Sequence, residues 1–320
     1  MSDLSYLQAT VIGALQGVTE LVPISSLGHS VLVPALLGGS WAHLVTESSA
    51  QDSEASPYLA FVVALHVATA LALLVFYRAD WARIIAAFVR TVRTRRVVTS
   101  TERLAWLIVI ATIPVGLTGL LLEHTFRTLF ARPLAAAVFL LVNGLILLGG
   151  ERLRRRVETR HTGEHPAAPP TGEGASTPVR DPGAGWGVVV ARRRALDTLS
   201  YREGCLIGAF QTLALLAGIS RSGVTMVGGL LRGLDHEDAA KFAFLLATPV
   251  ILAAGVLKLP SLAGPAGAGI HGQVLTGALI AGLAAYLSVR FLTRYFTTRT
   301  LTPFAVYCLI AGALCLARFA

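Results

Sequence analysis

Six apolar segments, each close to the length that crosses a lipid bilayer, restrict what this chain can fold into. A transmembrane helix needs about 20 predominantly apolar residues. Of the 320 residues, 54% are hydrophobic and only 14% are charged, whereas a soluble chain carries about 25% charged residues to cover its surface. The sequence therefore predicts an all-α polytopic membrane protein. Its six expected transmembrane helices lie near residues 58–77, 104–122, 134–150, 240–258, 273–291 and 303–318.

Two more apolar segments, residues 7–38 and 204–234, are interrupted in the middle by glycine, serine and ionisable residues. Non-helical backbone at membrane depth is tolerated only where protein buries it or where it lines a watery cavity. We therefore expect two re-entrant helix–loop–helix hairpins, which enter the membrane and turn back. The interrupting residues are Pro23, Ser25, Ser26, Gly28 and His29 in the first hairpin, and Gly218, Ser220, Arg221, Ser222 and Gly223 in the second.

The two hairpins also resemble each other in sequence. Residues 12–30 align with residues 207–225 without a gap at a constant shift of 195, and eight of the nineteen positions are identical. Three expected spans follow each hairpin, and an odd number of crossings inverts the second half relative to the first. This pattern predicts an inverted-topology repeat, an architecture that forms central sites from broken helices. We expect a first half over residues 1–150, a cytoplasmic and partly disordered linker over 151–203, and a second half over 204–320.

Arginine is distributed unevenly between the expected loops. Residues 78–103 contain seven arginines and residues 152–203 contain ten, whereas residues 40–57 contain neither lysine nor arginine. Because cytoplasmic loops are enriched in basic residues, the first two loops belong inside, and residues 40–57 and both termini belong outside. Membrane topology thus accounts for the net charge of +9, and we predict no nucleic-acid partner.

The two hairpin breaks contain ionisable residues, which are rare within membranes and are commonly functional. Glu20, His29 and Arg221 lie in these segments. Glycines there allow backbone N–H groups to approach a ligand, and helix N-termini after the breaks favour anions. A guanidinium group matches the oxygens of a phosphate. The cluster therefore predicts a phosphate-binding pocket with a nucleophile and an acid–base pair, and its hydroxyls are Ser25, Ser26, Ser220, Ser222 and Thr225.

Each of these residues also has a structural interpretation. Glu20 and Arg221 would form an ion pair that locks the two halves together, and the serines would support helix packing. His29 would be a hydrogen-bonded structural imidazole. His66, inside an apolar segment, is interpreted as a buried structural histidine. The clustering of ionisable groups in two repeat-related breaks favours the functional interpretation for the breaks.

Two motifs in the hairpins resemble those of a known family. The segments QGVTELVPISSLGHS, residues 16–30, and AGISRSGVT, residues 217–225, are similar to the signature motifs of the undecaprenyl-diphosphate phosphatase family, also called the bacitracin-resistance proteins. The resemblance covers the whole chain apart from the linker. It implies a phosphatase that converts undecaprenyl diphosphate to undecaprenyl phosphate and inorganic phosphate at the outer face of the bacterial cytoplasmic membrane. That reaction recycles the lipid carrier for cell-wall synthesis.

Carried over residue by residue, the resemblance implies a role for each position of the site. Ser26 matches the proposed nucleophile, and His29 matches the proposed general base or acid. Glu20 matches the second acidic position, and Arg221 matches the phosphate-binding arginine. The resemblance also implies substrate contacts from Gln16, Ser25, Ser220, Ser222, Gly223 and Thr225. Substitution of Ser25 or His66 by alanine is expected to cost far less activity than substitution of the four catalytic residues.

Several alternatives stay open in the sequence. Ser26 either attacks phosphorus itself or positions the phosphate for attack by water. Oxygen ligands suit Mg²⁺ or Ca²⁺, for which Glu20 is the candidate ligand, and we expect no organic cofactor. The competing function is an inverted-repeat transporter or flippase of a lipid phosphate. The expected partners are an isoprenoid diphosphate, the lipid bilayer and a second copy of the chain in a homodimer.

Overall fold

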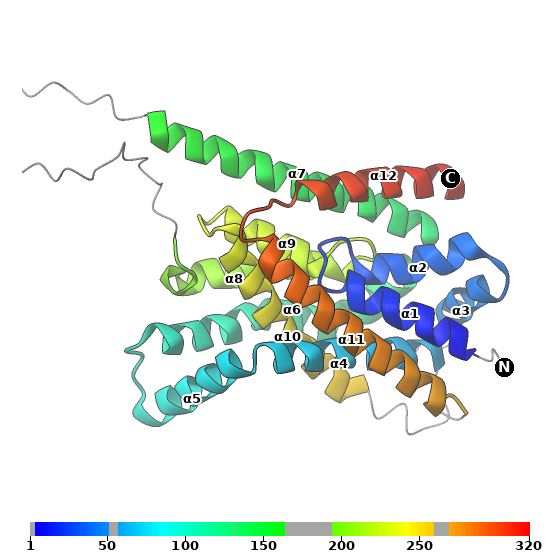
Figure 1. The fold of residues 1–320 in the computed structure, drawn as a ribbon, viewed down its shortest axis with the longest axis horizontal. Coiled ribbons are helices and arrows are strands. Elements are labelled where there is room, and N and C mark those ends of the chain that lie inside the picture. Colours follow the sequence, from blue (N-terminus) through cyan, green and yellow to red (C-terminus); the bar gives the residue numbers. More distant parts are fainter. Residues whose placement is uncertain (1–3, 51–56, 131, 164–193, 259–268) are drawn as a thin grey trace, which may run out of the picture.

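The computed structural model describes residues 4–50, 57–130, 132–163, 194–258 and 269–320, which are predominantly helical (Figure 1). Apart from an isolated bridge between Arg194 and Leu234, these residues form no strand. The predicted all-α class is therefore confirmed. The helices are α1 Tyr6–Thr19, α2 Ser26–Leu37, α3 Gly39–Ala50, α4 Pro57–Phe76, α5 Arg78–Thr94, α6 Ser100–Phe130, α7 Pro133–Gly163, η1 Leu196–Thr198, α8 Tyr201–Phe210, η2 Gln211–Leu215, α9 Arg221–Leu230, α10 His236–Lys258, α11 His271–Tyr295 and α12 Thr302–Phe319.

The six expected spans correspond to α4, α6, α7, α10, α11 and α12. Among the described residues, five of these helices are individually long and apolar enough to cross a membrane, and α4 meets the same criterion only together with α5. These two helices are bent by 86° at the break between Phe76 and Arg78. Because several helices can span a bilayer, the chain is a multi-pass membrane protein.

Two segments that the sequence predicts as loops contain helices. α3 occupies most of residues 40–57, and α5 occupies most of residues 78–103. α5 is amphipathic, because Ile84 and Ala87 are buried while the side chains of Arg83 and Arg90 are mostly exposed. The number of arginines predicts a cytoplasmic segment, but their spacing also fits the 3.6-residue period of an amphipathic helix.

The expected linker over residues 151–203 also begins as helix, because α7 continues to Gly163. Residues 194–203 form an extended segment, η1 and the start of α8. The disorder expected within this linker cannot be compared over residues 164–193, which lie outside the described residues.

Both expected hairpin breaks are present, and repeat-related residues begin their helices. Ser5 caps α1 and Ser200 caps α8, each in a capping box, and these two serines are related by the same shift of 195. After the breaks, Ser25 caps α2 and Ser220 caps α9 in the same relationship. A serine oxygen at the N-cap accepts an otherwise unpaired backbone N–H of the first turn. The sequence similarity of the two hairpins thus extends to the serines that cap their helices.

Each hairpin packs on a span from the other half of the chain. α1 lies against α11, and α8 lies against α6 (Figure 1). Glycines at repeat-related positions make both contacts close. A Cβ atom on Gly13 would lie 2.5 Å from the carbonyl oxygen of Gly277, and one on Gly208 would lie 2.0 Å from that of Ala111. This exchange of hairpins supports the repeat, and its inversion across the membrane stays a prediction.

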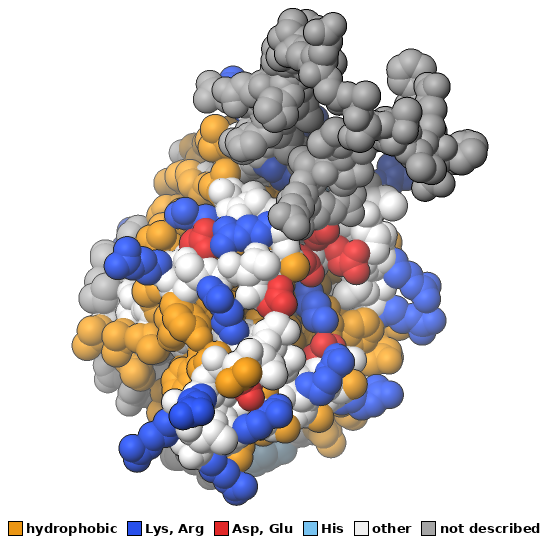
Figure 2. Space-filling model, turned by 90° about the vertical axis from the view of Figure 1, so that its left-hand side faces the viewer, with side chains coloured by type: hydrophobic (Ala, Val, Ile, Leu, Met, Phe, Trp, Pro, Cys, Tyr) orange, Lys and Arg blue, Asp and Glu red, His pale blue; other side chains and the backbone are white. Residues whose placement is uncertain are grey.

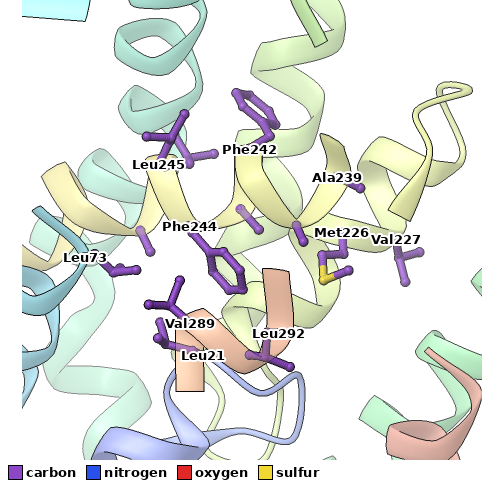
Figure 3. Packing of buried hydrophobic residues seen from close by; sticks show 14 of the residues in the cluster. Leu21, Leu73, Met226, Val227, Ala239, Phe242, Phe244, Leu245, Val289 and Leu292 are labelled. Carbon is purple, nitrogen blue, oxygen red and sulfur yellow. The ribbon is translucent and has the colours of Figure 1, made fainter. Parts of the chain in front are cut away.

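Buried apolar side chains hold the first hairpin break against the spans. Leu21 lies near Phe244 of α10 and near Val289 and Leu292 of α11 (Figure 3). All four side chains are almost completely buried. Because close-packed side chains resist displacement, this cluster fixes the backbone next to Glu20.

Candidate active site

The carboxylate of Glu20 is the centre of the site. Glu20 directly follows α1 and is buried. Its Oε2 accepts a hydrogen bond from Nε2 of Gln16 at 2.9 Å and another from the Ser26 hydroxyl. Its Oε1 binds Nη2 of Arg221 in a salt bridge. Residues from α1, α2 and α9 therefore meet at one side chain, although Arg221 is 201 positions away in sequence.

Ser26 and Arg221 occupy equivalent places in their hairpins. Ser26 is the first residue of α2, and Arg221 is the first residue of α9. The first turns of a helix expose backbone N–H groups, and the helix dipole adds partial positive charge at this end. The two N-termini and the guanidinium group thus make the region between the breaks favourable for an anion.

His29 belongs to the same hairpin but has different partners from the predicted ones. Its Nδ1 lies 2.7 Å from the carbonyl oxygen of Ser25, and its Nε2 lies 2.8 Å from the hydroxyl of Tyr307, on which its ring stacks. The structure therefore pairs the Ser26 hydroxyl with Glu20 and pairs His29 with Tyr307. Sequence analysis missed Tyr307, which is 278 positions from His29 on an apolar helix.

His66 lies at the site, although its sequence context suggests a structural residue. Its Nε2 is 3.3 Å from Oε2 of Glu20, and its side chain is 23% exposed. The position is on α4, outside both hairpins. No motif points to it, and the only signal in the sequence is an ionisable side chain within an apolar span.

The remaining hydroxyls of the second hairpin lie next to Arg221. The Oγ atoms of Ser220 and Ser222 are 3.0 Å apart, and Oγ of Ser220 also accepts the backbone N–H of Gly223 at 3.2 Å. The hydroxyl of Thr225 donates to the carbonyl oxygen of Arg221 at 2.8 Å. Ser220, Ser222 and Thr225 are buried, so these hydroxyls order the first turn of α9 around the arginine.

Asn143 on α7 joins the two breaks and was missed by sequence analysis. Its Nδ2 donates to the carbonyl oxygen of Pro23 at 3.1 Å, and its Oδ1 accepts the backbone N–H of Ser220 at 3.0 Å. The side chain is fully buried. A buried amide that satisfies one backbone group from each break fixes the distance between the breaks.

The described residues offer little to a metal ion. They contain no cluster of three or more His, Cys, Asp and Glu side chains that could hold one. Glu20 already binds four protein groups, which are supplied by Gln16, Ser26, His66 and Arg221. Mg²⁺ and Ca²⁺ need six or more oxygen ligands. Within the described ranges, the side chains around Glu20 therefore offer no ready-made set of ligands for either cation.

Taken together, the fold and the site define a polytopic helical membrane protein with a buried serine, a buried carboxylate and a partly exposed arginine at two paired hairpin breaks, an arrangement suited to phosphoryl chemistry. The family model described as bacitracin resistance protein BacA matches residues 9–314, and the chain belongs to this family.

Curated relatives match the chain over nearly its whole length. Undecaprenyl-diphosphatase 2 of Frankia alni is 67% identical, and the alignment covers 100% of this chain and 99% of that protein. Undecaprenyl-diphosphatase of Mycolicibacterium paratuberculosis is 58% identical, and the alignment covers 97% of this chain and 96% of that protein. Undecaprenyl-diphosphatase of Granulibacter bethesdensis is 41% identical, and the alignment covers 98% of this chain and 96% of that protein.

Proposed function

We propose that the site hydrolyses undecaprenyl diphosphate to undecaprenyl phosphate and inorganic phosphate, which recycles the lipid carrier and supports resistance to bacitracin. The names of the relatives indicate the substrate. The observation that carries the chemistry is the Ser26 hydroxyl, which donates to Glu20 while Arg221 binds the other oxygen of the same carboxylate. A hydroxyl paired with a base, beside a cation, is the arrangement that phosphoryl transfer to serine needs.

Arg221 binds the terminal phosphoryl group in this mechanism. A guanidinium group has five N–H donors in a planar fork, so it can contact phosphate oxygens while Nη2 still binds Glu20. The N-terminal N–H groups of α2 and α9 add further donors. These groups stabilise the negative charge on the phosphoryl oxygens in the transition state.

Ser26 is the nucleophile of the first step. Its Oγ attacks the terminal phosphorus, the bond between that phosphorus and the bridging oxygen breaks, and undecaprenyl phosphate leaves. The proton of the hydroxyl passes to Oε2 of Glu20, to which it is already hydrogen-bonded. Glu20 is therefore the general base, in place of the His29 expected from the family motif.

Water completes the reaction in the second step. Its oxygen attacks the phosphoserine, the bond between phosphorus and Oγ breaks, and Glu20 returns its proton to the serine. A proton of the water passes to the hydroxyl oxygen of Tyr307, which gives its own proton to Nε2 of His29, the atom to which it is hydrogen-bonded. Direct attack by water on the diphosphate is the competing route, and it forms no phosphoserine.

The proposed site faces the outer side of the cytoplasmic membrane. The arginine-rich α5 lies at one end of the molecule, and both chain termini lie at the other end (Figure 1). Many Lys and Arg side chains are spread over the end that Figure 2 shows, as expected for a cytoplasmic surface. The first hairpin, which carries Ser26 and Glu20, starts from the end with the termini.

Two further expectations accompany this function. Mg²⁺ or Ca²⁺ would bind through ligands supplied mainly by the diphosphate, and turnover measured in EDTA tests whether the reaction requires such a cation. A homodimer also stays a prediction, and cross-linking of the purified protein followed by electrophoresis tests it.

The function is tested with the purified wild-type protein in detergent, supplied with undecaprenyl diphosphate. Inorganic phosphate should appear without any gradient, together with undecaprenyl phosphate in equal amounts. A transporter or flippase of lipid phosphates would release no phosphate under these conditions, and that result would overturn the proposed function.

A further inference from the structure

We propose that His66 is a positioning residue for this reaction, which holds the Glu20 carboxylate in the orientation that accepts the Ser26 proton. The proposal rests on the proposed function, because the Glu20 carboxylate acts as a base that needs positioning only if Ser26 attacks phosphorus. No motif of the family resemblance includes His66, and its sequence context predicts only a structural role.

The contacts of the imidazole ring carry the proposal. Nε2 lies 3.3 Å from Oε2 of Glu20, the same oxygen that accepts the Ser26 hydroxyl. A carboxylate only accepts hydrogen bonds, so the proton of this contact belongs to Nε2. Nδ1 lies 2.8 Å from the carbonyl oxygen of Val62, one turn earlier on α4. This oxygen also only accepts, so a ring that donates in both contacts carries a proton on each nitrogen, and the two contacts together fix its plane.

His66 lies on α4, a helix that is held in place by its packing against neighbouring spans. Leu65 and Thr69, on either side of it, are fully buried on α4. α4 packs against α10 and α11, and neither of those helices belongs to a hairpin break. The donor to Glu20 therefore comes from a span that is separate from the breaks carrying the reacting groups.

This separate span matters because the two oxygens of Glu20 have competing partners. Arg221 binds Oε1 from the second hairpin, and a bound phosphate would share the same guanidinium group with Glu20 and so weaken this contact. Gln16 and His66 both bind Oε2, the oxygen that faces Ser26. They keep the base at the serine while Arg221 engages the substrate. The 23% exposure of the His66 side chain, against 3% for Glu20, places the histidine at the rim of the site.

Three substitutions separate positioning from simple space filling. His66→Ala removes the donor. His66→Gln places an amide N–H close to the position of Nε2, whereas His66→Asn reaches only to the position of Nδ1. Because the role concerns the transition state, kcat should fall at least about 10-fold in His66→Ala and His66→Asn while KM changes little. His66→Gln should restore kcat to within about 3-fold of the wild type, as expected when a single hydrogen bond is replaced.

The experiment measures kcat and KM for phosphate release from undecaprenyl diphosphate, on variants that elute as the wild type does in size-exclusion chromatography. His271→Ala, an exposed histidine at the start of α11, is the matched control and should keep full activity. If His66→Ala misfolds, the Gln and Asn variants, which differ by one methylene, decide the question.

Two contrary results have different meanings. Full kcat in His66→Ala or His66→Asn, with Glu20→Gln inactive, would overturn the positioning role and leave the proposed function intact. An equal loss of kcat in the Gln and Asn variants would also overturn it, because the loss would then not depend on the Nε2 donor. Full activity in Glu20→Gln would instead overturn the proposed mechanism itself.

Discussion

Oγ of Ser25 accepts the backbone N–H of Gly218 at 3.2 Å, across 193 positions of sequence. The same oxygen accepts the N–H of Gly28 at 3.2 Å as the cap of α2. The two breaks approach so closely that a Cβ atom on Gly28 would lie 2.8 Å from Cα of Gly218. The Ser25 hydroxyl thus caps α2 in the first hairpin and also binds the backbone of the second hairpin break. This shared contact holds the two breaks together.

This contact changes the expectation for Ser25→Ala. The substitution would leave two buried backbone N–H groups, of Gly28 and Gly218, without an acceptor. Each such group costs about 1–3 kcal/mol. We expect a lower Tm in detergent and at least about a 10-fold loss of turnover. Ser30→Ala is the control, because the Ser30 hydroxyl only donates to a carbonyl of its own helix. Equal Tm and turnover in the two variants would contradict the bridging role.

Asn143 makes a second connection between the breaks. Asn143→Ala would leave the buried N–H of Ser220 unpaired and the carbonyl oxygen of Pro23 with only a 4.0 Å contact to the Cys308 thiol. We expect the Tm to fall and turnover to drop at least about 10-fold, because the distance between Ser26 and Arg221 would no longer be fixed. Thr118→Ala, which removes a hydroxyl bonded within α6, should have little effect. Wild-type turnover in Asn143→Ala would show that the spans alone position the breaks.

Much of the fold could be predicted from local patterns. Long apolar segments indicate spans, and glycine, serine and charge within an apolar segment indicate a break, because both signals act on the nearby backbone. α3 and α5 were missed because charge and small polar residues suggested loops. In α5 the arginines occupy the exposed side of a helix whose other side packs against α6.

The site was predicted less completely, because its contacts depend on packing between distant segments. The motifs identify Glu20, Ser26 and Arg221, which the structure brings together. They do not determine which base lies next to the serine. His29 and Glu20 lie three and six positions from Ser26, and only the backbone geometry of the break decides that Glu20 reaches the hydroxyl. His66 and Asn143 have no signal beyond a polar side chain in an apolar span.

A pH-dependent contribution to stability is expected at the start of α8. Arg194 binds both carboxylate oxygens of Glu203, at 2.7 and 2.8 Å, and lowers the pKa of Glu203 from 4.5 to about 2. Because the folded protein holds the ionised form more strongly than the unfolded chain does, the contribution is complete above about pH 4.5 and is lost between about 4.5 and 2.

Glu203→Gln tests this expectation. The variant should have a lower Tm than the wild type at pH 7, and the difference should stay constant down to about pH 5 and shrink at more acidic pH. Thermal unfolding in detergent at a series of pH values measures it. A difference that grew as the pH fell would contradict the assignment of the low pKa to Glu203.

The topology is tested by cysteine labelling in intact cells. Ser40→Cys places an exposed thiol in the first turn of α3, and Arg96→Cys places one between α5 and α6. A Cys205→Ala background removes the exposed natural cysteine, since Cys308 and Cys315 are buried. A membrane-impermeant maleimide should label Ser40→Cys and spare Arg96→Cys, because basic segments stay in the cytoplasm. The opposite labelling pattern would invert the model and place the first hairpin on the cytoplasmic side.

The central claim is that Ser26 attacks phosphorus with Glu20 as its base. The most direct measurement is the steady-state rate of phosphate release from undecaprenyl diphosphate by Ser26→Ala and Glu20→Gln, compared with the wild type. Ser26→Ala should abolish turnover, and Glu20→Gln should lower kcat at least about 10²-fold, because the hydroxyl would lose the group that takes its proton. Turnover by Ser26→Ala within about 10-fold of the wild-type rate, from protein shown to be folded, would contradict the account and favour direct attack by water.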